Sequence, residues 1–374
     1  MAAHRPRIVL VGGDGSPTGV PRHIVALSRA LSPMADILVV SEADRGGFSG
    51  LEGRHIALPG LASSLRPGSV WRGYGALMDT LRAEEADLVW LHARLPVVLG
   101  RLGARRGAFN ARVAVTFHGL PFGPGHRPAL AGLSRLGERW LARRTPPLDM
   151  VFLTAAQRDA MAAHLGRDAA RHRMSVLGNA STLGPLPTAR ERPVGRRLVM
   201  TGRAGRQKNL EAAVAILPHL PSDTYLSLCG PGTDNARFAD KLKAIAGTAR
   251  SRLNLLGPID DVGALLAAAD GYLLTSRYEG EPIGALEAWE AGLPVFLADF
   301  PGARALARHP FSHVFGSTTP ASRAREITAT LDAFLTDRSR HAADIRQSWA
   351  THHAPEAFAA KARTLVETML SSRP

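Results

Sequence analysis

Glu279 and Glu287 lie eight positions apart in a stretch that also contains Gly280, Pro282 and Gly284. Side chains on one face of a helix recur after three, four or seven residues, so these two carboxylates cannot share a face of one straight helix. The glycines and the proline instead predict a loop that opens into a helix. Glu279 would then belong to the loop and Glu287 to the first helical turn, whose free backbone N–H groups would lie between them. Such a site can hold a phosphate at the helix end while the carboxylates accept hydrogen bonds from sugar hydroxyls.

The residues on either side of this stretch favour a site over an ordinary surface loop. An apolar run over 271–276 predicts a strand before the loop, and residues 295–298 predict the next strand. Gly292 and Pro294 end the intervening helix, which is predicted over 285–291. A bare pair of glutamates would favour a solvated loop and an amphipathic helix. The order of strand, loop, helix and strand favours a ligand site at a strand end.

A second group of charges follows the strand predicted over 198–201. Gly202 opens a turn from strand to helix, and Arg203 and Lys208 would extend from this turn into a cleft. Two cations there suit a diphosphate, which needs charge neutralised on two phosphorus atoms. Either residue alone would indicate ordinary surface charge, but together with the glutamate loop they favour an anion site.

Four weaker signals accompany these residues. Gly230 follows the strand predicted over 225–229, and Ile259 lies in a loop with glycine and proline, so both could border a nucleotide. The loop over 12–20, which includes Gly19, can cradle a phosphate. It lacks the spacing of the common nucleotide-binding glycine signatures, which disfavours a dinucleotide oxidoreductase. His118 ends the strand predicted over 113–117, and a histidine there is as often functional as structural.

The composition is that of a globular protein with room for two domains. The chain has 374 residues, of which 45% are hydrophobic. Cys229 is its one cysteine, so no intrachain disulfide can form, which fits a reducing cytoplasm. No signal peptide is expected, and no apolar run approaches the roughly 20 residues that span a bilayer. We therefore expect a cytoplasmic protein.

The positive charge is concentrated in the first half of the chain. The net charge is +14, and residues 1–190 hold 24 arginines against 13 acidic residues. Nucleic acid, an anionic membrane surface or a polyanionic substrate would each explain this excess. A solvated surface in an arginine-rich chain explains it equally well, because lysine occurs only at 208, 241, 243 and 361.

Strands and helices are predicted to alternate along both halves, which indicates parallel sheets with helices on both faces. In the first half, strands are predicted over 8–11, 37–40, 88–91, 113–117 and 150–153, and helices over 23–31, 75–84, 97–106, 133–143 and 155–164. In the second half, strands are predicted over 198–201, 226–228, 253–256, 272–275 and 295–298, and helices over 210–217, 237–246, 262–268, 285–291, 322–335, 341–349 and 355–370. The prolines within 178–194 indicate a linker between two domains.

The motifs also occur in a known order. Residues 116–119, Arg203 with Lys208, and Glu279 with Glu287 stand as they do in the retaining glycosyltransferases of family 4, which this chain resembles over essentially its whole length. Residues 19–23 and 176–179 are similar to two weaker landmarks of that family. The resemblance implies the α/β fold named GT-B, with two doubly wound Rossmann-like domains facing across a cleft and a C-terminal helix that crosses back to the N-terminal domain. It implies an acceptor-binding domain over 1–185, a nucleotide-sugar-binding domain over 186–350 and the returning helix over 351–374.

The resemblance further implies a role for each site residue. Arg203 and Lys208 would hold the diphosphate, and Glu287 would bind the ribose hydroxyls. Glu279 would contact the donor sugar, and His118 would line the sugar pocket and help to stabilise an oxocarbenium-like transition state. The implied catalytic residues are His118, Arg203, Lys208 and Glu279. The implied donor-binding residues are Gly19, Gly202, Gly230, Ile259, Glu279, Ile283, Gly284, Ala285, Leu286 and Glu287.

The implied reaction moves a hexosyl group from a nucleotide sugar to a hydroxyl acceptor with retention of configuration. No obvious nucleophile is present, so front-face attack is expected. The chain has no Asp-x-Asp motif, so no metal and no other cofactor is expected. The chain departs from the family at Glu281, which adds a carboxylate after Gly280 and leaves the donor contacts open. It also departs at Ala180, where glycine is usual and would leave the backbone freer.

Basic helices with an apolar face indicate an acceptor class. Arginines at 101, 105, 106, 112, 127, 135, 139, 143 and 144 are interleaved with leucines at 99, 102, 130, 133, 136 and 141 and with Trp140. This pattern suits an anionic bilayer surface. We therefore predict a lipid-linked or cell-envelope glycan acceptor, as in polysaccharide or lipopolysaccharide biosynthesis, with the protein peripheral on the inner face of the membrane.

Other functions stay open. A soluble metabolite could be the acceptor, and a sugar-nucleotide epimerase or hydrolase of related fold would share the nucleotide site without needing an acceptor. A nucleic-acid-binding protein is disfavoured, because the sequence shows no aromatic stacking platform and no recognised nucleic-acid motif.

Overall fold

The computed structural model describes residues 5–62, 67–123, 125–186 and 195–371. The chain divides into two compact units. Unit 1 comprises Met1–Gly123, Arg127–Ala180 and Pro355–Pro374, and unit 2 comprises Pro124–His126 and Ser181–Ala354. The sequence analysis placed these divisions after residues 185 and 350. The predicted linker over 178–194 falls partly outside the described residues.

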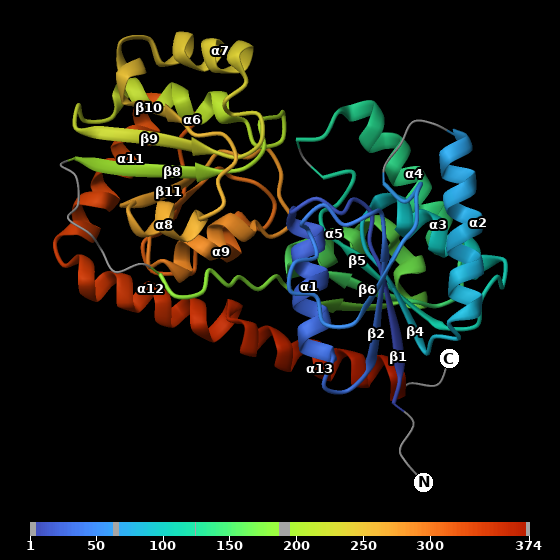
Figure 1. Ribbon diagram of the computed structural model, residues 1–374. Coiled ribbons are helices and arrows are strands. Elements are labelled where there is room, and N and C mark those ends of the chain that lie inside the picture. Colours follow the sequence, from blue (N-terminus) through green and yellow to red (C-terminus); the bar gives the residue numbers. More distant parts are fainter. Residues whose placement is uncertain (1–4, 63–66, 124, 187–194, 372–374) are drawn as a thin grey trace. The chain divides into compact units, whose positions relative to one another are not determined.

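Unit 1 is built on a parallel sheet of seven strands in the order β3-β2-β1-β4-β5-β6-β7 within the described residues (Figure 1). The strands are β1 (Arg7–Val11), β2 (Asp36–Ser41), β3 (Arg54–Ala57), β4 (Leu88–Leu91), β5 (Arg112–Phe117), β6 (Asp149–Phe152) and β7 (Arg173–Val176). The register places Ile8 beside both Ile37 of β2 and Leu88 of β4. The strand order reverses between β1 and β4, and ligands of such sheets bind beyond the carboxyl ends of the strands at that point.

Helices cover both faces of this sheet because alternate strand residues point to opposite sides. The helical elements of unit 1 are α1 (Gly19–Leu31), α2 (Pro67–Ala83), α3 (Arg94–Arg105), α4 (Pro128–Arg144), α5 (Ala155–Leu165), the 3₁₀ helix η1 (Gly166–Arg171) and α13 (Pro355–Ser371). Ile8 and Leu10 of β1 belong to an apolar cluster with α1 and α13. Val9 and Val11 belong to a second cluster with α2, α3, α4 and α5.

The C-terminal helix α13 packs within unit 1, as predicted. Phe358 and Val366 are buried beside α1. The Arg363 guanidinium donates to the carbonyl oxygen of Ala30 at 2.8 Å, and the Arg173 guanidinium donates to that of Thr368 at 3.0 Å. The last helix therefore belongs to the apolar core of the N-terminal unit.

Unit 2 repeats the architecture with a parallel sheet of six strands in the order β10-β9-β8-β11-β12-β13 within the described residues. The strands are β8 (Arg196–Thr201), β9 (Thr224–Cys229), β10 (Leu253–Leu255), β11 (Gly271–Leu274), β12 (Val295–Leu297) and β13 (Ser312–Val314). The helical elements are α6 (Leu210–Ile216), η2 (Leu217–His219), α7 (Ala236–Ala246), η3 (Gly247–Arg252), α8 (Val262–Ala267), α9 (Ile283–Glu290), α10 (Ala303–Leu306), α11 (Pro320–Leu335) and α12 (Arg338–His353). Here the strand order reverses between β8 and β11.

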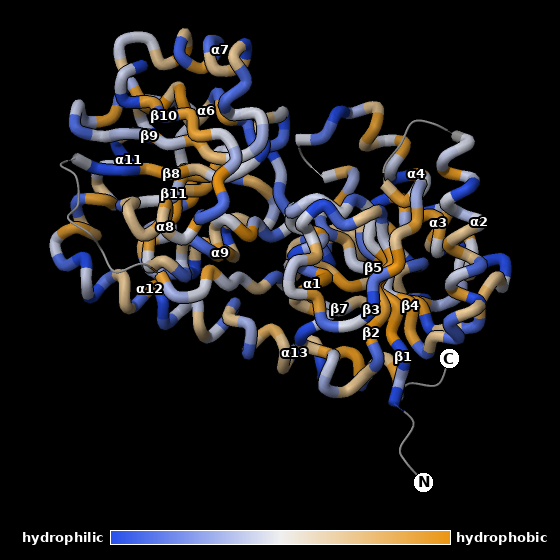
Figure 2. The backbone as a smooth tube through the Cα atoms, viewed as in Figure 1, coloured by the Kyte–Doolittle hydropathy of each residue, from blue (hydrophilic) through white to orange (hydrophobic). Residues whose placement is uncertain are grey.

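The predictions lacked the two edge strands of unit 1 as well as β13 and the short helix α10 of unit 2, and several helices start earlier than predicted. Central strands such as β1 and β4 are strongly hydrophobic (Figure 2). The edge strands β3 and β7 hold no fully buried residue and contain arginine, histidine and serine, so their composition resembles a loop. Helix α2 starts at Pro67 rather than at the predicted residue 75. No helix in the described part of the chain is long and apolar enough to cross a membrane.

Candidate functional site

The two charged loops of unit 2 leave adjacent strands at the point where the strand order reverses. The loop with Arg203 and Lys208 follows β8, and the loop with Glu279 follows β11. The two loops are hydrogen-bonded, because the Arg277 N–H donates to the carbonyl oxygen of Gln207 at 2.8 Å. The Gln207 side-chain amide donates to the carbonyl oxygen of Tyr278 at 3.1 Å. The structure therefore fixes both loops as one surface at the carboxyl edge of the sheet.

Lys208 and Glu279 form an ion pair on this surface. The Lys208 Nζ lies 2.8 Å from Glu279 Oε1, and the side chains are 22% and 7% exposed. Burial, the largest influence, lowers the pKa of the Lys208 ammonium, but the Glu279 carboxylate and, further down, Tyr272 and Glu287 raise it, and the pKa is raised overall. The lysine therefore carries its charge at neutral pH, where it can bind an anion.

Glu287 belongs to the same electrostatic neighbourhood but not to the turn that was predicted. Helix α9 begins at Ile283, so Glu287 stands in its second turn, and the prediction of the first turn was wrong. The Glu287 side chain is buried, and its charge contributes to raising the pKa of Lys208, of Tyr272 and of the Cys229 thiol. A buried carboxylate within reach of these groups suits the recognition of hydroxyls.

Helix α9 starts two residues before the predicted residue 285. Gly284 allows the first turn of this helix to pack on Tyr272. A Cβ atom at position 284 would lie 2.2 Å from Tyr272 Oη and 2.6 Å from Thr201 Oγ1. Thr201 Oγ1 and Tyr272 Oη are themselves hydrogen-bonded at 2.8 Å. Sequence reasoning assigned Tyr272 only to a strand, since nothing in its spacing distinguishes it from a core aromatic residue.

The first turn of α9 offers two backbone donors. The Ala285 and Leu286 N–H groups donate to the carbonyl oxygen of Pro282 at 2.9 and 3.4 Å. The N–H groups of Ile283 and Gly284 have no acceptor in the part of the chain that the structure describes. The side chains of Ala285 and Leu286 are fully buried in the core. The donors that a ligand could use are therefore those of the first two helical residues.

Three glycine-containing turns line the same edge. Gly202 has φ +148°, and a Cβ there would lie 2.7 Å from Lys208 Cε, so the lysine stem lies over this glycine. Gly230 has φ +135°, and its N–H donates to the carbonyl oxygen of Gly257 at 2.8 Å. The Ile259 backbone makes a hydrogen bond with the Cys229 thiol. The turns after β8, β9 and β10 are thus joined side by side.

Arg203 is less constrained than Lys208. It lies five positions earlier on the same loop, its side chain is exposed, and it makes no ion pair with the residues that the structure describes. The loop backbone is held on both sides, because the Ala204 N–H donates to Pro231 O at 2.9 Å and the Asn209 N–H to Gly205 O at 3.2 Å. The guanidinium is therefore on an anchored loop with its donors open to solvent.

Glu281, where the chain departs from the family pattern, is buried and lies beside His353. Its Oε1 is 4.0 Å from His353 Nδ1, at the end of α12. The extra carboxylate thus has a partner inside unit 2.

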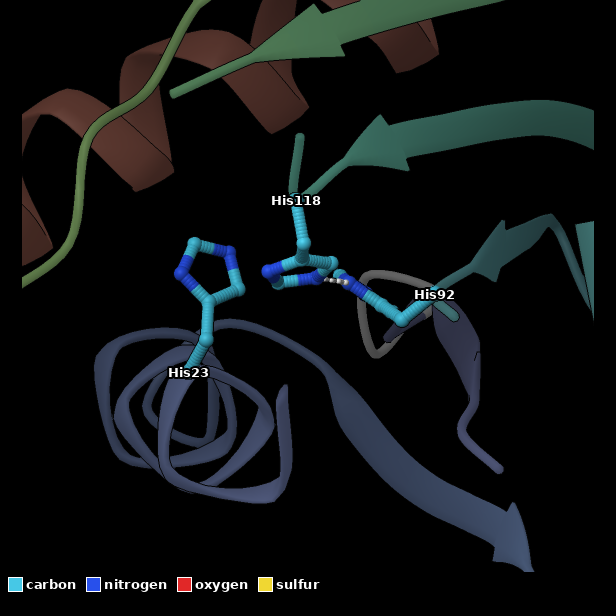
Figure 3. A group of neighbouring side chains, drawn as sticks. All are labelled: His23, His92 and His118. Atoms are coloured by element: carbon cyan, nitrogen blue, oxygen red, sulfur yellow. Dashed lines mark hydrogen bonds between the residues drawn. The ribbon is translucent and has the colours of Figure 1, made fainter. Parts of the chain in front are cut away.

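The remaining predicted residues lie in unit 1. Gly19 is the exposed first residue of α1, and His118 follows the end of β5. The half-buried His118 is not isolated, because His23 from α1 and His92 from the end of β4 lie beside it (Figure 3). His92 Nδ1 and His118 Nε2 are 3.2 Å apart. His92 was missed, although it follows a buried strand in the same way as His118.

Comparison with known proteins identifies the family of the chain. Two family profiles match the chain, "Glycosyltransferase Family 4" over residues 17–180 and "Glycosyl transferases group 1" over residues 191–350. Two Rossmann-like units, each built on a parallel sheet, are the architecture of the GT-B class. The chain belongs to the GT-B glycosyltransferases of the family 4 type.

Individual relatives are more distant. The chain is 28% identical over 255 residues to the UDP-Gal:alpha-D-GlcNAc-diphosphoundecaprenol alpha-1,3-galactosyltransferase of Escherichia coli, over 63% of this chain and 64% of the relative. The match spans less than two thirds of the length of the curated relatives. The structure of Anabaena Alr3699/HepE in complex with UDP and glucose aligns with a TM-score of 0.77 and 16% identity, over 97% of this chain and 100% of the other. WaaG, a glycosyltransferase involved in lipopolysaccharide biosynthesis, aligns with a TM-score of 0.70 and 18% identity, over 96% and 99%.

Proposed function

We propose that this protein is a retaining glycosyltransferase that moves a sugar from a nucleotide-sugar donor to a hydroxyl acceptor. The observation that carries the proposal is the contact of Lys208 with Glu279 at the carboxyl edge of unit 2, next to the start of α9. A cation, two open backbone donors and buried carboxylates suit the diphosphate, the ribose and the sugar of such a donor. A solved structure of this fold holds UDP and glucose, which supports this class of donor.

Each side chain then has one task. Lys208 and Arg203 bind the diphosphate, assisted by the N–H groups of Ile283 and Gly284. Glu287 accepts hydrogen bonds from the ribose hydroxyls, and Glu279 accepts them from the donor sugar. Gly202, Gly230 and Ile259 border the nucleotide with their backbone. For His118 and Gly19 of unit 1 we propose the roles that the family resemblance implies.

The reaction follows from these tasks as a front-face substitution. The bond between the anomeric carbon and the phosphate oxygen breaks first, and the acceptor oxygen bonds to the same face of the sugar. The acceptor proton passes to the departing phosphate oxygen. Negative charge therefore grows on the diphosphate in the transition state, where Lys208 and Arg203 stabilise it. Because these cations neutralise the leaving group, we propose that no divalent metal is required.

A thermal-shift screen across nucleotide sugars tests the donor site. Ligand that binds the native state raises the apparent unfolding temperature, so one nucleotide sugar should raise it more than free sugars or inorganic phosphate do. Incubation of that donor with and without candidate acceptors then separates transfer from hydrolysis or epimerisation. A chain that is stabilised by none of these nucleotides at millimolar concentration does not have the proposed site.

We propose a lipid-linked or envelope-glycan acceptor on the basis of helix α4. Its exposed ridge consists of Leu130, Leu133, Leu136 and Trp140, which are 59%, 68%, 71% and 43% exposed. The Arg105 guanidinium lies 5.0 Å from the Trp140 ring, so the ridge is flanked by positive charge. An apolar ridge with arginines at its border suits the surface of an anionic bilayer.

Two arginines of the predicted basic set do not belong to this surface. Arg101 is fully buried and pairs with Glu138 at 2.6 Å, so its assignment to the surface was wrong. Arg112 is half-buried, and its guanidinium donates to the carbonyl oxygen of Met369. Periodicity could not distinguish them, because an arginine buried by an ion pair has the same spacing as one in solvent.

Replacement of Leu133 and Leu136 by serine should weaken binding to vesicles. We expect the intact protein to sediment with phosphatidylglycerol vesicles at low salt. The double variant should partition at least about tenfold less, because each leucine that becomes buried in the bilayer contributes about 1.5–3 kcal/mol to binding. Leu256 and Leu335, which are 40% and 36% exposed in unit 2, provide a matched control pair for the same change. Equal sedimentation of the intact protein and the Leu133/Leu136 variant would exclude α4 as the membrane surface.

A further inference from the structure

Three histidines converge at the carboxyl edge of the unit 1 sheet, where the proposed reaction uses only one of them. His23 comes from α1, His92 follows β4 and His118 follows β5, and Figure 3 shows the His118 ring between the rings of the other two. One ring nitrogen of each histidine lies within 4.8 Å of those of the other two. Among the histidines, cysteines and carboxylates of the described residues, no other group of three has this spacing.

The His23 ring is held with its free nitrogen available. Its Nδ1 lies 2.8 Å from Asn179 Oδ1. An amide oxygen only accepts hydrogen bonds, so Nδ1 carries the proton and Nε2 carries the lone pair. His23 Nε2 is buried and has no hydrogen-bond partner in the described part of the chain. Metal-binding histidines are commonly oriented in this way, with the second ring nitrogen donating to an oxygen.

The other two histidines are hydrogen-bonded to each other at the spacing of metal ligands, so one of the two nitrogens carries a proton that moves to the other nitrogen of its ring when a metal binds. His92 Nδ1 and His118 Nε2 are 3.2 Å apart. Two nitrogens bound tetrahedrally to zinc at about 2.0–2.1 Å lie about 3.3 Å from each other. One nitrogen of each of the three rings lies within 4.8 Å of the others, so separations would have to shorten by at most about 1.5 Å to reach tetrahedral zinc geometry.

The surroundings provide neutral nitrogen ligands. Burial is the main cause that lowers the pKa of each ring, to about 4 for His23 and well below the usual value for His92 and His118. Burial thus favours the neutral ring, which is the form that binds a metal. Three imidazoles without a carboxylate suit zinc or cobalt and not magnesium or calcium, which prefer oxygen ligands.

We propose that His23, His92 and His118 form a binding site for a divalent transition metal of the zinc type. Occupation of this site would withdraw His118 from the role in transfer that is proposed for it. Zinc would thus be an inhibitor of transfer, and this second consequence rests on the proposed function. Binding itself does not depend on that function.

Titration of the chelator-treated, full-length protein tests the site directly. Calorimetry with Zn²⁺ should give one equivalent bound, and Co²⁺ should give the intense visible absorption of a tetrahedral complex with nitrogen ligands. His92→Ala and His118→Ala should each weaken Zn²⁺ binding at least about a hundredfold, because a direct ligand is lost. His219→Ala, at an exposed position of unit 2, is the control and should bind as the parent protein does. Thermal unfolding of each variant confirms that it is folded.

The outcomes separate the site from the reaction. Absence of stoichiometric binding, or binding that survives both His92→Ala and His118→Ala, overturns the proposal. If transfer is measurable, Zn²⁺ should lower it reversibly in the parent protein, and the transfer retained by His92→Ala should resist Zn²⁺. A cobalt spectrum that depends on His92 without any transferase activity would support the metal site and count against the proposed function.

Discussion

Replacing Lys208 by alanine should lower the turnover of sugar transfer by about a hundredfold or more. This is the range for loss of an oriented charge that stabilises the transition state. Lys208 is held 2.8 Å from Glu279 and has a raised pKa, so it is charged at the pH of the reaction. Because charge grows on the diphosphate as the bond breaks, the loss should be larger in kcat than in KM.

A second lysine provides a matched control. Lys241 also lies 2.8 Å from a glutamate, Glu211, but its side chain is 58% exposed on α7. Lys241→Ala should leave turnover within about twofold of the parent, because Lys241 has no proposed role in donor binding and its exposed ion pair contributes at most about 1 kcal/mol to stability. Initial rates with saturating donor, measured for both variants, provide the comparison. Near-normal turnover of Lys208→Ala would refute its role as the charge stabiliser.

Arg203→Ala should fall in the same range as Lys208→Ala. The structure gives Arg203 an exposed side chain on an anchored loop, so it contributes to no core and its loss should leave stability almost unchanged. A fall in turnover with an unchanged unfolding temperature would therefore report on the bound diphosphate alone. Parent-like turnover in Arg203→Ala would mean that Lys208 and the start of α9 stabilise the charge of the leaving group without Arg203.

The sequence was sufficient to predict the fold because its central strands are uniformly apolar. β1 and β4 are flanked by turns and followed by helical patterns, and this order is read directly from the chain. The edge strands β3 and β7 were not predicted. One side of an edge strand has no neighbouring strand, so less of it is buried and polar residues are tolerated.

The candidate site was only partly predictable. Lys208, Glu279 and Glu287 could be found because charged residues beside glycine at strand ends are conspicuous in sequence. Tyr272 could not, since its role depends on the close packing of Gly284 against its hydroxyl group. His92 and His23 meet His118 only because β1, β4 and β5 are neighbours in the sheet, and sequence spacing carries no such information.

The largest expected effect on stability is at Arg101 of α3. Its guanidinium is fully buried and contacts Glu138 of α4 at 2.6 Å, and the glutamate side chain is 10% exposed. Arg101→Met removes the cation and leaves a buried carboxylate unpaired, which should destabilise unit 1 by about 3–5 kcal/mol. Arg82→Met is the control. It breaks an exposed pair with Asp79 and should cost about 0.5 kcal/mol or less.

Because the chain has two units, a single unfolding temperature would mix their transitions. Hydrogen exchange of peptides from β4 and β5, measured as a function of urea, reports the opening of unit 1 by itself. An Arg101→Met protein whose core peptides exchange as slowly as those of the parent would show that the Glu138 carboxylate finds water or a proton at little cost.

The double variant Arg101→Met, Glu138→Leu should recover most of the stability that Arg101→Met loses. This recovery distinguishes an ion pair with a net stabilising effect from one whose attraction only offsets the cost of burying the two charges. In the native protein, Arg101 Nε and Nη2 are buried without a hydrogen-bond partner among the described residues, so the charge is incompletely solvated even with Glu138 present. Well-packed apolar replacements of such pairs are often neutral or stabilising. We therefore expect the free energy of unfolding of the double variant to be no more than about 1 kcal/mol below that of the parent. A double variant as unstable as Arg101→Met alone would mean that the aliphatic packing of the arginine stem, and not its charge, holds α3 against α4.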